Sequence, residues 1–169
     1  MTMRRTVLML AALALLTAVR PARASGDDAE PWLRELHHKD RVTTGEVLLA
    51  AALISDDKQW HEDPDWALKV AKRRDLLFCR PPGGLKAHAR REWAASVFAR
   101  LLDIEGGLWS RILDQSPRYA YRELVTLGLI APGGPRVPLN GDELAGLLLA
   151  AERYRKHGPE RLPQRGVTP

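Results

Sequence analysis

The chain has little of several features that would point to a particular chemistry. Cys79 is its single cysteine, so no intramolecular disulfide can form. Because Cys79 ends the apolar run that starts at Leu76, we expect a buried, inert thiol. The sequence has no nucleophile elbow and no phosphate-binding loop. Its acidic segment 56–65 lacks the glycine and the alternating spacing of an EF-hand loop. We therefore expect that the protein is not an enzyme and that it has neither a cofactor nor a metal site.

The one long apolar run lies at the N-terminus. Met1–Arg5 is basic, Thr6–Val19 is apolar, and Ala22–Ala24 is a small-x-small cleavage site. This run is shorter than the roughly 20 residues that a membrane-spanning helix needs, so we predict that residues 1–24 are a cleaved signal peptide. Arg4-Arg5 loosely resembles a twin-arginine signal, so the Sec and twin-arginine routes both stay open. The mature protein is expected in the periplasm or cell envelope, without a membrane span.

Positive charge is concentrated at the two ends of the chain. The whole sequence has 26 Lys and Arg against 21 Asp and Glu, a net charge of +5. The body, residues 25–154, has 18 basic against 20 acidic residues, a net charge of −2, which argues against nucleic acid as a partner. Residues 155–169 are basic, rich in Gly and Pro, and without apolar periodicity. We predict that they form a disordered tail.

Apolar residues recur at helical spacing throughout the body, and no stretch alternates as a half-buried strand does. Breaks rich in turn residues, such as Arg80-Pro-Pro-Gly-Gly84, separate these segments. The pattern predicts an all-α fold. The helices are expected at residues 28–38, 43–55, 64–77, 89–104, 117–128 and 140–156, with one further helical turn at 108–113.

A glutamate that opens an apolar helix occurs three times, at Glu46, Glu92 and Glu143. Thr43 and Asn140 stand three residues before the first and last of these, which predicts two capping boxes. In the middle copy Ala89 has the cap position, so that helix is expected to lack a side-chain cap. The recurrence indicates a modular array in which each unit buries its apolar face against its neighbours.

A second recurring segment precedes the later glutamates. Trp66-Ala67 and Tyr119-Ala120 each open a helix with an apolar end. Together with Ala89-Arg90-Arg91-Glu92, these segments resemble S-layer homology modules, in which an aromatic-Ala helix and a turn precede a Thr-Arg-Ala-Glu motif that opens an apolar helix. The resemblance covers about residues 30–154. It implies three modules around a central three-helix bundle, with a truncated unit at about 30–55 and complete units at about 63–104 and 117–154.

The resemblance also implies a function. S-layer homology modules hold proteins at the cell envelope by binding cell-wall polysaccharide, often pyruvylated, and the motif Arg contributes to the groove for this acidic ligand. Arg90 occupies the motif's Arg position here, whereas Thr44 and Gly141 occupy it in the other units. We therefore expect a non-catalytic module that binds cell-wall glycan or peptidoglycan. The expected ligand-binding residues are Arg90, Arg91, Lys72, Arg73 and Trp66.

Two other functions stay open on the sequence alone. The same bundle can present Trp60, Trp93 or Trp109 as anchors of a protein–protein interface, which makes an adaptor in an envelope or secretion assembly the alternative. A small periplasmic hydrolase would need a cleft in which His88, Glu92 or the acidic segment converge.

Overall fold

A computed structural model describes residues 29–55, 60–104 and 116–158. These ranges form six α-helices and no named strand, which confirms the predicted all-α class. The predicted signal peptide, the predicted helical turn at 108–113 and Trp109 lie outside the described residues. The helices are α2 (Glu30–His37), α3 (Thr44–Ile54), α4 (Pro64–Arg73), α5 (Arg91–Leu101), α7 (Pro117–Thr126) and α8 (Gly141–His157).

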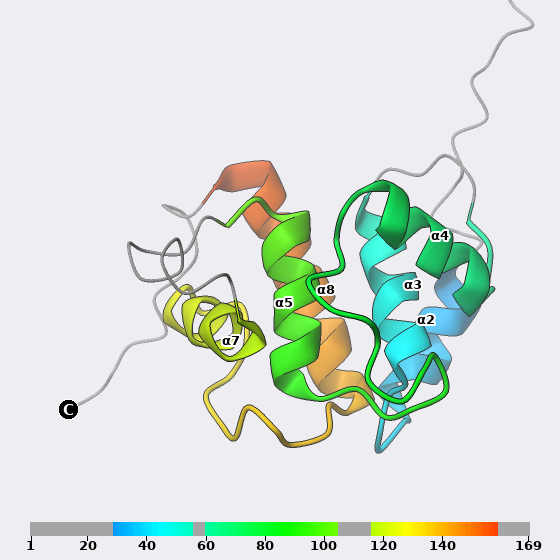
Figure 1. Ribbon diagram of the computed structural model, residues 1–169, viewed down its shortest axis with the longest axis horizontal. Coiled ribbons are helices and arrows are strands. Elements are labelled where there is room, and N and C mark those ends of the chain that lie inside the picture. Colours follow the sequence, from blue (N-terminus) through cyan, green and yellow to red (C-terminus); the bar gives the residue numbers. More distant parts are fainter. Residues whose placement is uncertain (1–28, 56–59, 105–115, 159–169) are drawn as a thin grey trace, which may run out of the picture.

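Helix α3 contacts α4, α5 and α8, and in the view of Figure 1 it lies between α5 and α4. Nine of its eleven residues are buried, as expected for a helix that is apolar on every side. Helices α3, α5 and α8 each carry a second helix: α4 packs on α3, α7 on α5, and α2 on α8. The first and last helices of the described chain are therefore neighbours. No helix in the described ranges is long and apolar enough to span a membrane.

Both predicted capping boxes are confirmed. At the start of α3, the Thr43 hydroxyl accepts a hydrogen bond from the Glu46 amide, 3.3 Å, and Glu46 Oε2 accepts from the Thr43 amide, 2.6 Å. At the start of α8, Asn140 Oδ1 accepts from the Glu143 amide, 2.8 Å, and Glu143 Oε2 accepts from the Asn140 amide, 3.3 Å. These bonds satisfy amide groups that a helix start leaves without a partner inside the helix.

The predicted cap of the middle helix is wrong by one residue. The N-cap of α5 is Arg90, not Ala89, and it makes no side-chain cap. Trp93 therefore holds the third helical position, which Glu46 and Glu143 hold in α3 and α8, and Glu92 holds the second. In this register Arg91, and not Arg90, corresponds to Thr44 and Gly141.

A closed cycle of three backbone hydrogen bonds sets this register. The Val42 amide donates to the Leu139 carbonyl, the Leu139 amide to the Ala89 carbonyl, and the Ala89 amide to the Val42 carbonyl, each at 2.9 Å. All three residues are buried, and each directly precedes the N-cap of α3, α5 or α8. We call this cycle the ring. It holds the starts of three helices together and leaves Ala89 unable to act as the cap.

The ends of several predicted segments also differ from the structure, and two of these differences matter for the prediction. Helix α4 stops at Arg73, four residues early, and Asp75 then adopts a positive φ of 53°. The chain leaves the helical path there, so Cys79 is exposed and the prediction of a buried thiol is wrong. Helix α8 continues to His157, three residues into the predicted tail, and Arg155 donates to the Ile54 carbonyl at the end of α3.

Candidate functional site

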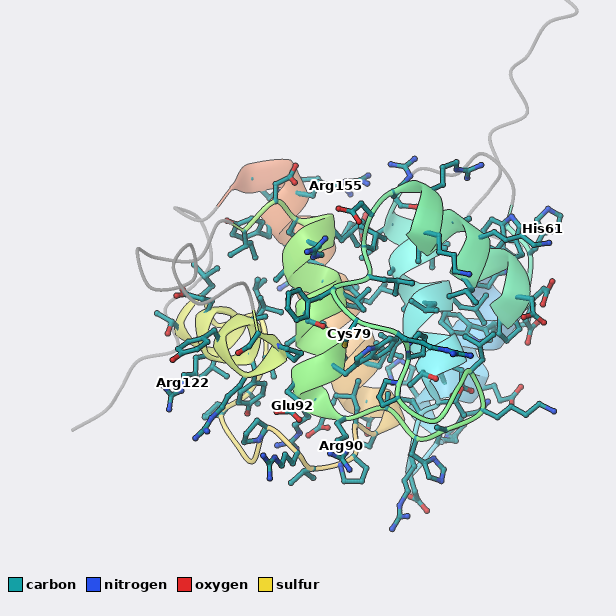
Figure 2. All side chains as sticks on the ribbon, in the orientation of Figure 1. His61, Cys79, Arg90, Glu92, Arg122 and Arg155 are labelled. Atoms are coloured by element: carbon teal, nitrogen blue, oxygen red, sulfur yellow. The ribbon has the colours of Figure 1, made fainter. Side chains whose placement is uncertain are left out.

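A hollow of about 580 Å³ lies beside the start of α5. Its lining comes from three parts of the chain: Glu92 of α5, Arg118 of α7, and residues 134–138 before α8. Figure 2 shows Arg90 and Glu92 at the same end of α5, close to the segment that leads into α8. Arg90 does not line the hollow, although its backbone forms an antiparallel bridge with Pro138, which does. The volume falls within the roughly 300–1,000 Å³ of small-ligand sites.

The wall of the hollow is an irregular segment fixed to α5 by its backbone. Residues 131–138 read Ala-Pro-Gly-Gly-Pro-Arg-Val-Pro, and three prolines in eight residues prevent a helix. The Val137 carbonyl accepts from the Arg91 amide at 3.1 Å, and the Pro135 carbonyl accepts from the Glu92 amide at 2.9 Å. These two bonds satisfy the first amides of α5 and hold the wall in place. The side chain of Val137 stays 46% exposed.

Three charged residues line this hollow: Arg118, Arg136 and Glu92. None of the three forms an ion pair or side-chain hydrogen bond with another described residue. Pro135, Val137 and Pro138 add apolar surface between them. An apolar wall with a few convergent polar groups is typical of a ligand site, and paired guanidinium groups suit a carboxylate.

Arg91 is committed to an internal contact. Its Nε donates to Glu143 Oε2 at 3.2 Å, and its Nη2 contacts Oε1 of the same carboxylate. Burial disfavours the charged guanidinium and is the largest single effect, but the hydrogen bond to Glu143, the charge of Glu143 and smaller contributions from Tyr121 together outweigh it and raise the pKa of Arg91. Gly133 packs against this guanidinium, and the carbonyl of Gly133 accepts from the Tyr121 hydroxyl at 3.0 Å. Arg91 therefore joins α5 to α8 and does not face a ligand.

The other predicted basic residues lie at a different end of the molecule. Lys72 and Arg73 end α4 and are exposed. Asp75, which follows them, accepts a 3.0 Å hydrogen bond from Arg100 near the end of α5. At 1.5 Å per residue, Arg100 lies about 14 Å along the helix from Arg91. The predicted ligand-binding residues therefore do not form one site, and none of the five lines the hollow.

Trp66 belongs to an aromatic cluster apart from the hollow. Its ring lies 6.4 Å from Trp60 and 5.2 Å from His61, and Trp60 lies 5.3 Å from Trp32. The cluster ties α4 to α2 and packs against the core. Trp93 is only 3% exposed and is itself part of the core, so its predicted role as an interface anchor is wrong.

The two arginines that line the hollow were missed on the sequence, whereas Glu92 was named there for a possible hydrolase cleft. Arg118 and Arg136 are 18 residues apart, and only packing of α7 against α5 brings them to one place. A signal was available, because each arginine directly follows a proline at the edge of a helix or turn. The lining has one carboxylate and no histidine, and in the described ranges no group of three or more His, Cys, Asp and Glu is placed to hold a metal.

An ion pair beside the ring gives the protein a specific pH dependence. Lys39 Nζ contacts Glu46 Oε1 at 2.6 Å, and the Glu46 side chain is 12% exposed. Burial by itself raises the pKa of Glu46, but hydrogen bonds from Lys39 and Thr43 lower it overall, below its usual 4.5. The unfolded chain then binds this proton more readily than the folded one, so the contribution of Glu46 is complete above about pH 4.5 and is lost in more acidic solution.

We therefore expect Glu46→Gln to remove part of the acid destabilisation. Wild type should lose about 1 kcal/mol of unfolding free energy through this group as the pH falls below 4.5, and the variant should not. Urea unfolding between pH 7 and 3 measures the difference. Glu35→Gln is the matched control, since Glu35 also contacts Lys39 but is 66% exposed. The prediction would be contradicted if the unfolding free energies of wild type and Glu46→Gln fell equally as the pH is lowered.

Comparison with family models, with curated proteins and with solved structures finds no match for the chain. The function therefore has to be inferred from the geometry and charge of the hollow. Three features support the inference: its two arginines pair with no described residue, it has an apolar wall, and it lies next to the ring.

Proposed function

We propose that the chain is an exported, non-catalytic module of the cell envelope that binds an acidic cell-wall polysaccharide in the hollow beside α5. One observation carries this proposal: Arg118 and Arg136 line an open, apolar-walled hollow and pair with no described residue. Guanidinium groups bind carboxylates through two parallel hydrogen bonds, and the apolar wall suits the less polar faces of sugar rings.

The arrangement of the helices supports the same proposal. Three helix starts meet in the ring, and the hollow lies where the start of α5 meets the segment before α8. A groove between units is where the resemblance to S-layer homology modules implies glycan binding. We propose that the chain is a degenerate array of this type. Arg118 and Arg136 would then be the ligand contacts, while Arg91 serves packing.

A sedimentation assay tests the proposal. The purified chain is mixed with cell-wall sacculi that retain their attached polysaccharide, and with sacculi from which acid has removed it. We expect the chain to sediment with the intact sacculi alone. Arg118→Ala/Arg136→Ala should reduce binding about tenfold or more, since two charge-assisted contacts are lost. Added salt should weaken binding.

Lys69→Ala/Lys72→Ala is the matched control. It removes the same charge from exposed positions on α4, away from the hollow. Binding by this control should equal that of wild type. Equal losses in both double variants would leave only a general charge effect and reject the hollow as the site. No retention of wild type on intact sacculi would reject the proposal, and capture of an envelope protein in its place would favour the adaptor.

A further inference from the structure

Glu92 does not fit a ligand that carries negative charge alone. Its carboxylate lines the same hollow as Arg118 and Arg136 and pairs with no described residue. It would repel an anionic group held nearby by the guanidinium groups. A site for a purely acidic polymer would be better served by a neutral residue at this position.

Helix capping does not account for this carboxylate. The capping-box glutamates hold the third position of α3 and α8, whereas Glu92 holds the second position of α5 and Trp93 the third. Arg90 is the N-cap and makes no side-chain cap hydrogen bond. The Glu92 amide already donates to the Pro135 carbonyl. The helix dipole favours an acidic residue here, but only by a modest amount.

We infer that the ligand is zwitterionic: it carries a protonated amine that pairs with Glu92 next to a carboxylate held by Arg118 and Arg136. This inference rests on the proposed function and narrows it to polysaccharides that carry free amino groups as well as acidic groups. Two positive groups and one negative group around a single hollow match such a ligand in sign at every point. A polymer that carries carboxylates alone can pair with the arginines, but its negative charge is repelled by Glu92.

Three soluble polymers separate these cases. Carboxymethyl chitosan carries carboxylates and amines, the same polymer after N-acetylation carries the carboxylates with the amines blocked, and polygalacturonate carries carboxylates alone. Binding is measured by calorimetry at about pH 6, where an ordinary amine is protonated. We expect wild type to bind carboxymethyl chitosan about tenfold more tightly than either of the other two.

Glu92→Gln removes the negative charge and keeps the shape. We expect this variant to bind carboxymethyl chitosan more weakly and polygalacturonate more tightly than wild type, so that the preference disappears. Arg118→Ala/Arg136→Ala should weaken the binding of all three polymers. Lys69→Ala/Lys72→Ala should change none of them, because it lies away from the hollow.

The outcomes distinguish this inference from the proposed function. Equal affinity for the acetylated and unacetylated polymers, or a preference that Glu92→Gln leaves intact, would overturn the zwitterion inference and leave glycan binding standing. Retention on sacculi without affinity for any of the three polymers would overturn it as well. No binding to sacculi or to any polymer would overturn the proposed function.

Discussion

Gly141→Ala is expected to cost about 4 kcal/mol of unfolding free energy or to prevent folding. Gly141 is the first residue of α8, and a Cβ at this position would overlap the carbonyl oxygen of Leu36 in α2. The obstacle is backbone, so no rotamer change relieves it. The Gly141 amide also donates to the Lys39 carbonyl at 2.8 Å, which keeps the two segments close. Forced overlap in a packed contact is among the few mechanisms with effects this large.

Gly146→Ala provides the control within the same helix. A Cβ at Gly146 would meet no atom within 4 Å, and Ala is the better helix former by about 1 kcal/mol. We expect this variant to be more stable than wild type in urea unfolding followed by circular dichroism. If Gly141→Ala were as stable as wild type, α2 would not pack on the start of α8 as described.

Trp93→Ala is expected to cost about 3–5 kcal/mol, because it empties a site filled by a large buried side chain. Trp93 is 3% exposed and packs in the core. Glu92→Ala should cost about 0.5 kcal/mol, which reflects the loss of its interaction with the helix dipole. Urea unfolding of the two variants measures both values.

These neighbouring substitutions also test the register of α5. With Ala89 as the cap, Glu92 would be the capping-box residue, and its loss would cost about 1 kcal/mol or more. With Arg90 as the cap, Glu92 has no such role and Trp93 points into the core. A larger loss at Glu92 than at Trp93 would therefore contradict the structure.

The helices could be predicted from the sequence because their signals are local. Apolar spacing and turn residues indicated all six helices, and Thr43 and Asn140 gave the caps of α3 and α8. The register of α5 could not be found in this way. The segment Ala89–Glu92 allows two helix starts. The choice between them is made by hydrogen bonds that join Ala89 to Val42 and Leu139, which lie 47 and 50 positions away in the sequence.

The candidate site was predicted only in part, for a similar reason. Of the lining residues, Glu92 was named from the sequence, but Arg118 and Arg136 come together only through packing. Lys72 and Arg73 looked like partners of Arg90 because they precede it in the same predicted unit. The last turn of α4 lies beside the end of α5 and away from the start of α5.

The packing of the first helix on the last has a consequence for how the chain matures. Until α8 is available, α2 lacks the helix on which it packs, and the Val42 amide lacks its acceptor on Leu139. No N-terminal portion can therefore complete the core while the remainder is being synthesised. The core of the described chain is complete only when α8 docks.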